Sequence, residues 1–293
     1  MAGSLAALPL TPAISCIIPV FNGMRDIDRA IDSVLAQRAD VQVVLVDDCS
    51  TDGSRDHILE RARGDPRIVA LAMTQNRGQG YARNIGVAAA EARFVTFLDQ
   101  DDEHLPGWYD VAIEALDSLP RYVGIRGELQ LAGAGALPLI DRSDPRWPAI
   151  VNSPIWNVVM HKAVYQAIGG SPTGQVFRTR EGNEDWVVTQ TIKRHFAIGK
   201  SEFIAVRHMV RPGNAGDYFL SRTRVTDGGF EFLERTKVEA DGSLARALAQ
   251  YQARADANVA LLRPPQLSPR RGTLRALAAR LLDRFLGRPP VLR

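Results

Sequence analysis

The chain has 293 residues, of which 45% are apolar and 24% charged, a composition that excludes global disorder. The formal net charge is only +3, too small to indicate a nucleic-acid partner. Residues 263–293 carry eight arginines and one aspartate, so the basic character belongs to the C-terminal tail. Two cysteines, Cys16 and Cys49, are too few for a disulfide framework or a cysteine-based zinc site.

The first 24 residues contain no charged side chain, and in this they resemble the apolar part of an export signal or of a membrane segment. Prolines interrupt this stretch, its apolar runs are short, and no basic segment precedes it, which argues against both. We interpret residues 1–12 as a flexible leader and expect a cytoplasmic protein.

Short apolar segments alternate with amphipathic segments in the first hundred residues. This alternation predicts an α/β fold with a mostly parallel sheet covered by helices. The expected strands are 14–20, 41–46, 67–71 and 94–98, and the expected helices are 27–35, 54–63 and 80–92. Ligands of such sheets bind beyond the carboxyl ends of the strands, where this sequence places its polar clusters.

The later pattern is looser. We predict a strand over 122–131, a loop over 132–154, helices over 157–168 and 184–196, a short strand over 203–207 and a helix over 230–262. Residues 273–287 form a basic amphipathic pattern. Such a helix either lies on an anionic membrane surface or packs on protein, and both interpretations stay open.

Three carboxylates, Asp99, Asp101 and Asp102, follow the fourth predicted strand. Packed without a cation they would repel one another, and a hard divalent ion such as Mg²⁺ or Mn²⁺ would relieve this repulsion. The alternative is a solvated acidic loop before a helix. His208 is a candidate further ligand or a structural histidine.

Three further sites carry candidate functional residues. Asp48 is a candidate ligand contact, with Asp52 and Gly53 as the turn beside it. Arg83 follows Gly78-x-Gly80 at a helix start, where it could face a pyrophosphate. Asp185 is either a general base or, with Glu184, an acidic pair that favours a helix N-terminus.

Taken together, six segments resemble the family 2 glycosyltransferases over residues 14–214. They are 17–22 (IIPVFN), 46–54 (VDDCSTDGS), 76–86 (NRGQGYARNIG), 97–102 (FLDQDD), 182–185 (GNED) and 207–208 (RH). The resemblance implies the GT-A fold, with a nucleotide-sugar-binding half over 13–125, an acceptor-binding half over 126–235 and a helical extension over 236–293.

The resemblance also implies roles for individual residues. Pro19 and Phe21 would flank the donor base, Asp48 would bind it, and Asn22, Arg83, Asp99 and Glu184 would contact the nucleotide-sugar. Asp99, Asp101, Asp102 and His208 would hold Mn²⁺ or Mg²⁺. Asp185 would be the catalytic base. Phe21 replaces the commoner tyrosine, and residues 171–183 are longer and more polar than the usual link.

The implied activity is sugar transfer with inversion, from a UDP-sugar or related donor to a glycan or lipid-linked acceptor hydroxyl. The basic tail would make the protein peripheral at the inner face of the plasma membrane. Two alternatives remain. A sugar-phosphate nucleotidyltransferase would need a Gly-rich loop with a lysine after the first strand, which is absent here. A non-catalytic nucleotide-sugar-binding protein would not need Asp99, Asp101 and Asp185.

Overall fold

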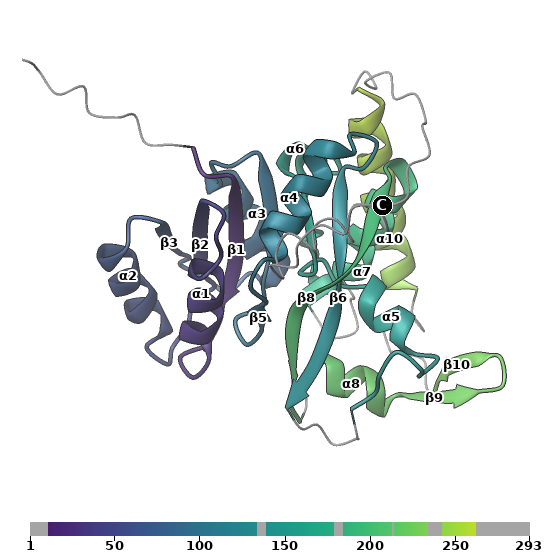
Figure 1. The fold of residues 1–293 in the computed structure, drawn as a ribbon. Helices are drawn as coiled ribbons and strands as arrows, with labels where there is room; N and C mark the ends of the chain where they lie inside the picture. Colours follow the sequence, from purple (N-terminus) through teal and green to yellow (C-terminus); the bar gives the residue numbers. More distant parts are fainter. Residues whose placement is uncertain (1–10, 134–138, 179–183, 213, 234–241, 262–293) are drawn as a thin grey trace, which may run out of the picture.

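The computed structural model describes residues 11–133, 139–178, 184–212, 214–233 and 242–261. Eight strands form one sheet in the order β3-β2-β1-β4-β7-β6-β8-β5. Their bounds are β1 Ile14–Val20, β2 Val41–Asp47, β3 Ile68–Ala72, β4 Phe94–Phe97, β5 Glu103–His104, β6 Gly124–Gly133, β7 Val158–His161 and β8 Ile198–Val210. A hairpin of β9 (Thr223–Thr226) and β10 (Gly229–Phe232) projects from the body (Figure 1).

Helices alternate with these strands along the described residues. Their bounds are α1 Ile27–Leu35, α2 Ser54–Gly64, α3 Gln79–Ala89, α4 Trp108–Ser118, α5 Trp147–Asn152, α6 Lys162–Ala167, α7 Glu184–His195, α8 Ala215–Ser221 and α10 Ser243–Ala260, with a 3₁₀ turn η1 at Gln175–Arg178. Strands β1, β2 and β3 with helices α1 and α2 lie on one side of the molecule, and β6, β8, α7 and α10 lie on the other (Figure 1).

The predicted parallel sheet is confirmed for its first four strands. Strands β3, β2, β1 and β4 are mutually parallel, and every residue of β1 and β2 is buried, which explains their unbroken apolar sequences. The rest of the sheet is mixed. Strand β7 is antiparallel to both β4 and β6, and β6 is parallel to β8.

The structure corrects three predictions in the second half. Residues 158–161 of the expected helix form strand β7, because they complete the sheet between β4 and β6. Helix α5 lies within the expected loop 132–154. The expected helix 230–262 begins instead with strand β10, and its helical part is α10.

Helix α10 lies within the predicted C-terminal extension over 236–293. Its Tyr251 packs with Phe177 and Val187, and the Tyr251 hydroxyl donates to the Gly170 carbonyl at 2.6 Å. Asp256 binds His195 of α7 at 2.8 Å. The helix therefore holds both η1 and α7 in place.

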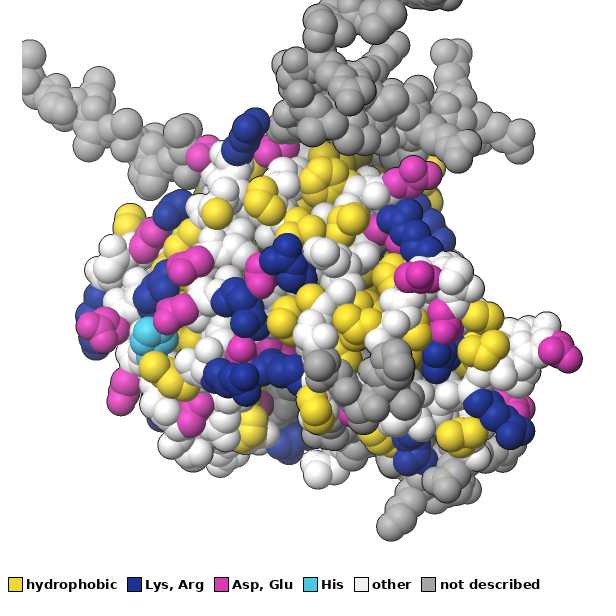
Figure 2. All heavy atoms as spheres, turned by 60° about the horizontal axis from the view of Figure 1, so that its bottom comes forward, with side chains coloured by type: hydrophobic (Ala, Val, Ile, Leu, Met, Phe, Trp, Pro, Cys, Tyr) yellow, Lys and Arg dark blue, Asp and Glu magenta, His cyan; other side chains and the backbone are white. Residues whose placement is uncertain are grey.

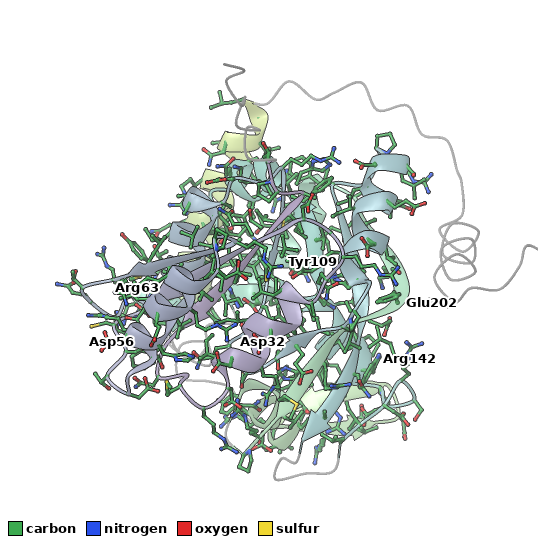
Figure 3. All side chains as sticks on the ribbon, turned by 60° about the vertical axis from the view of Figure 1, so that its left-hand side comes forward. Asp32, Asp56, Arg63, Tyr109, Arg142 and Glu202 are labelled. Atoms are coloured by element: carbon green, nitrogen blue, oxygen red, sulfur yellow. The ribbon has the colours of Figure 1, made fainter. Side chains whose placement is uncertain are left out.

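Charged side chains are spread over the surface of the fold. Side chains such as Arg63, Asp56 and Glu202 lie at the periphery, whereas Tyr109 lies inside the molecule (Figure 3). On the face in Figure 2, basic and acidic side chains are interspersed. Within the described residues, no helix is both long enough and apolar enough to span a membrane. The predicted leader up to residue 10 and the amphipathic segment 273–287 lie outside the described residues.

Candidate active site at the carboxyl edge of the sheet

The loops after β1, β2 and β4 meet at one edge of the sheet, as the sequence predicted. The Asp48 N–H donates to the Val20 carbonyl at 2.7 Å, which joins the first two loops. The Phe21 N–H donates to Oε1 of Gln100 at 2.9 Å, which joins the first loop to the third. The polar residues of three distant sequence segments therefore form one surface.

The adjacent acids Asp47 and Asp48 have different surroundings. Asp47 is buried and bound by the Cys49 and Ser50 N–H groups and by Arg55, so it stabilises its own loop. Asp48 reaches instead toward the loop before α3, where its two oxygens accept the N–H groups of Arg77 at 2.6 Å and Gly78 at 2.7 Å. Each oxygen keeps a further lone pair for a ligand.

The turn beside Asp48 also agrees with the prediction. Gly53 has a φ of 93°, in the left-handed region that favours glycine. The Asp52 carboxylate accepts the Ser54 N–H at 3.0 Å and the Met24 N–H at 3.1 Å. Asp52 therefore fixes the turn and leaves Asp48 facing the site.

The predicted base-flanking residues belong to β1 and the loop after it. Pro19 is buried within β1, beside Val46 of β2. The Phe21 side chain is 46% exposed, which leaves its aromatic face open to a ligand. Asn22 takes a left-handed φ of 50°, and its Oδ1 accepts the Thr51 N–H at 2.8 Å.

Arg83 connects the two halves of the chain. It lies on α3 and is completely buried. One guanidinium nitrogen, Nη2, donates to Asp99 at 3.0 Å, and the other, Nη1, donates to Glu184 at 2.7 Å and also to Asp185. A single cation therefore holds the predicted base beside Asp99, the first acid of the Asp-x-Asp pair Asp99-Gln100-Asp101.

The charges around Arg83 do not balance, because three carboxylates share one guanidinium. Burial raises the pKa of Asp99 to about 7 and that of Glu184 to about 7, against the opposing effect of Arg83. The three carboxylates in turn outweigh the burial of Arg83 and raise its pKa further above its ordinary value. The cluster therefore favours additional positive charge.

The remaining acids of the loop after β4 bind a different element. Asp102 accepts the Nδ1–H of His208 at 2.8 Å and the Met209 N–H at 2.8 Å. Asp101 forms an ion pair with Arg211, which also binds Asp26 at 2.5 Å. Both partners of Asp102 belong to β8, and Arg211 follows it directly, so β8 holds this loop in position.

His208 lies within β8, which is longer than the strand predicted at 203–207. Its ring stacks on Trp156, with 5.0 Å between ring centroids. Burial alone would lower the pKa of His208, but the Asp102 carboxylate outweighs it and raises this pKa to about 9. His208 is therefore a cation over the physiological range and a hydrogen-bond donor to Asp102.

The predicted metal ligands differ in how well they fit a cation. The described residues contain no group of three or more His, Cys, Asp or Glu side chains gathered to hold a metal ion. Both oxygens of Asp102 accept hydrogen bonds from β8, and His208 donates its Nδ1–H to Asp102, which leaves only its Nε2 for a ligand. Asp99 and Asp101 fit better, because each has one carboxylate oxygen without a hydrogen bond from the described residues, and each has a raised pKa caused by burial.

Several site residues were not predicted from the sequence. Gln79 donates to Asp99 at 2.6 Å, and Gln100 pairs with the backbone of Phe21. Both lie inside segments that carry the family resemblance, Gln79 in 76–86 and Gln100 in 97–102. Arg211 and Arg178 carry no local signal, because their partners are about a hundred residues or more away in sequence.

Comparison with known proteins agrees with this geometry. The family model described as "Glycosyl transferase family 2" matches residues 15–133. The succinoglycan biosynthesis protein ExoO of Rhizobium meliloti (strain 1021) is 38% identical over 120 residues, which cover 41% of this chain. The chain spans about a third (34%) of that protein's length.

Two solved structures have a similar fold. The S. aureus TarS 1–349 structure in complex with UDP-GlcNAc has a TM-score of 0.61 at 19% identity and covers 84% of this chain and 70% of that one. The mannosyltransferase PcManGT from Pyrobaculum calidifontis, in complex with GDP-Man and Mn²⁺, has a TM-score of 0.56 at 17% identity and covers 95% of this chain and 81% of that one. The chain thus has the GT-A fold, and its residues 15–133 match the glycosyl transferase family 2 domain.

Proposed function

We propose that this protein is an inverting glycosyltransferase that moves a sugar from a nucleotide-sugar, in the first instance a UDP-sugar, to an acceptor hydroxyl. The acceptor would be a glycan or a lipid-linked glycan of polysaccharide biosynthesis, the process named for ExoO. The family match favours this function over a nucleotidyltransferase.

The observation that carries the proposal is the bridge made by Arg83. Its guanidinium binds Asp99 of the donor half and Asp185 of the acceptor half. Asp185, the predicted base, and Asp99, the predicted donor contact, are thus held close together by the same guanidinium group. A direct displacement needs this proximity, because the acceptor oxygen must attack the carbon from which the diphosphate departs.

The donor half supplies the nucleotide contacts in this proposal. Phe21 offers an exposed ring for stacking on the base, and Asp48 offers its remaining lone pairs to a base N–H. Asn22 lies next to Phe21 on the same loop. Arg83 stays bound to its carboxylates and orients them, which modifies the expectation that it faces the pyrophosphate.

A divalent cation would be held by Asp99 and Asp101, whose carboxylates are hard oxygen ligands with one free oxygen each. When bound, such a cation offsets the negative charge of the departing nucleoside diphosphate. We assign Asp102 and His208 a positioning role, because their mutual hydrogen bond attaches the acidic loop to β8.

Asp185 is the proposed base. It lies at the start of α7, and Arg83 holds its carboxylate at the site. A carboxylate oxygen within hydrogen-bond reach of the acceptor hydroxyl takes that proton as the oxygen attacks. Glu184 binds the same nitrogen of Arg83 but is the more buried of the two acids, so we assign it a stabilising role.

The test uses UDP-, GDP- and dTDP-sugars with and without Mn²⁺. A bound donor raises the melting temperature of the native protein by mass action, so the correct donor is identified by its thermal shift. That donor should also release its nucleoside diphosphate slowly in the absence of acceptor. A panel in which no donor shifts the melting temperature and none is hydrolysed would overturn the proposal.

A further inference from the structure

Arg178 reaches from the acceptor half to the loop that surrounds Asp48. It is the last residue of η1, and its Nη2 donates to the carbonyl of Asn76 at 2.9 Å and to the Asn76 side chain at 2.8 Å. Asn76 in turn donates to the Asp48 carbonyl at 3.1 Å. A residue from the long polar link thus contacts the predicted nucleoside site.

The Arg178 stem lies directly over Gly78. A Cβ built on Gly78 would lie 3.1 Å from Cγ of Arg178 and 3.3 Å from its Nε. The Gly78 N–H donates to Asp48, so the guanidinium group lies close to that carboxylate. The charge of Arg178 acts against the burial that raises the pKa of Asp48, which supports this proximity.

Helix α10 fixes η1 in this position. Phe177, the neighbour of Arg178, is buried against Tyr251 of α10 and Val187 of α7. The Arg178 side chain is itself exposed, so it can exchange Asn76 for a ligand without disturbing the core.

We propose that Arg178 is a specificity-determining residue that reads the nucleobase of the donor together with Asp48. This inference rests on the proposed function. Asp48 presents an acceptor and Arg178 a donor, side by side. A base with a ring N–H next to a keto oxygen, as in uracil and guanine, satisfies both groups.

Asp48 and Arg178 together disfavour the binding of cytosine and adenine. Cytosine and adenine place an unprotonated ring nitrogen where uracil and guanine have the N–H, and an amino group where these have the keto oxygen. The nitrogen would face a carboxylate and the amino group a guanidinium, leaving both protein groups unpaired. Wild-type protein should therefore bind UDP and GDP more tightly than CDP and ADP.

The test is calorimetry with UDP, GDP, CDP, ADP and inorganic pyrophosphate, all with Mn²⁺, on wild type, Arg178→Ala and Arg178→Gln. The control is Arg63→Ala, an exposed arginine at the far end of α2 (Figure 3). Loss of a charged hydrogen bond should weaken UDP and GDP about tenfold or more in Arg178→Ala. The glutamine variant, which keeps an N–H donor, should recover part of this loss.

The remaining ligands separate base reading from other roles. CDP, ADP and pyrophosphate should bind Arg178→Ala within about twofold of wild type, so that the preference for keto bases is lost. Equal weakening of all ligands, pyrophosphate included, would instead show a phosphate contact or a structural role and overturn the inference. So would an unchanged base preference. If wild type binds none of the nucleotides, the proposed function itself fails.

Discussion

The side-chain amide of Gln100 pairs with the backbone of Phe21 as a neighbouring strand would. The Phe21 N–H donates to Oε1 at 2.9 Å, and Nε2 donates to the Phe21 carbonyl at 3.0 Å. Gly23 makes this approach possible, because a Cβ at that position would lie 2.3 Å from Oε1. The middle residue of the Asp-x-Asp pair thus positions the ring expected to stack on the donor base.

Gln100→Ala should therefore weaken UDP binding about threefold to tenfold, because two exposed hydrogen bonds that orient Phe21 are lost. Gly23→Ala should have a similar effect in wild type, since its methyl group displaces the amide, but little effect in the Gln100→Ala background. Calorimetry on the two single variants and the double variant measures this coupling. Strictly additive losses would contradict the link between Gly23 and Gln100.

Asp185→Asn should lower kcat about 100-fold or more, because an amide cannot accept the acceptor proton. Donor affinity should change little, and the matched variant Glu184→Gln should retain much more activity. Initial rates and donor titrations of both variants provide the measurement. Comparable losses of kcat in the two variants would mean that the pair serves only to position Arg83.

Arg83→Met should lower the free energy of unfolding by about 3–5 kcal/mol, because it leaves buried carboxylates without their cation. Adding Asp99→Asn should recover part of this loss. Urea unfolding measures both, with Arg67→Met as the control, since Arg67 is a half-exposed arginine that pairs with Asp65 at the surface. An Arg83 variant as stable as the control would show that solvent already compensates these charges.

Asp101→Asn should remove the dependence of UDP binding on Mn²⁺. In wild type, we expect EDTA to weaken UDP binding about tenfold or more, since the diphosphate would then face uncompensated carboxylates. Asp102→Asn should keep the metal dependence and instead lower the melting temperature, because it weakens the bonds to His208 and Met209. Calorimetry and thermal melts distinguish the two variants. Equal UDP affinity with and without Mn²⁺ would remove the cation from the proposal.

His104 should make stability depend on pH. It is buried, with Nδ1 bonded to the Tyr109 hydroxyl at 2.7 Å and Nε2 to the Trp156 carbonyl at 2.9 Å, and burial lowers its pKa to about 4. The unfolded chain takes up this proton near its ordinary pKa of 6.5, so stability is full above 6.5 and falls as pH drops toward 4. The loss from this group should be about 2–3 kcal/mol.

His104→Gln should remove this part of the acid destabilisation. The stability difference between wild type and variant, from urea unfolding at pH 7.5 and 4.5, should shrink by roughly the same 2–3 kcal/mol. A difference that stays constant between the two pH values would contradict the assignment of the effect to His104.

Local patterns were sufficient for residues 14–98, where each strand and helix has its own apolar pattern, but strand β5 (Glu103–His104) was not predicted. They failed where a distant partner decides the structure. Residues 158–161 (VVMH) are too few for a periodic pattern to separate strand from helix, and they are extended because β4 and β6 offer hydrogen bonds on either side. The hairpin does have a local signal, since Phe230-x-Phe232 alternates and Asp227-Gly228 precedes it as a turn.

The site shows the same division. The motifs identified Asp48, Asp99 and Asp185 individually, but no pattern indicated that Arg83 would bind both of the latter two. Ion pairs between residues about a hundred positions apart leave no periodicity in the sequence. Arg178 and Arg211 could be found only from the folded chain for the same reason.

The attachment of the acidic loop to β8 has a consequence for protein engineering. Asp101, Asp102 and Glu103 bind Arg211, His208 and Arg207 respectively, and the family match ends at residue 133, between the two sets. A chimera that joins a relative's donor half to this chain at that boundary would separate each acid from the base selected to pair with it. Grafts intended to change donor preference should therefore transfer residues 207–211 together with the loop, even though the sequence match does not include them.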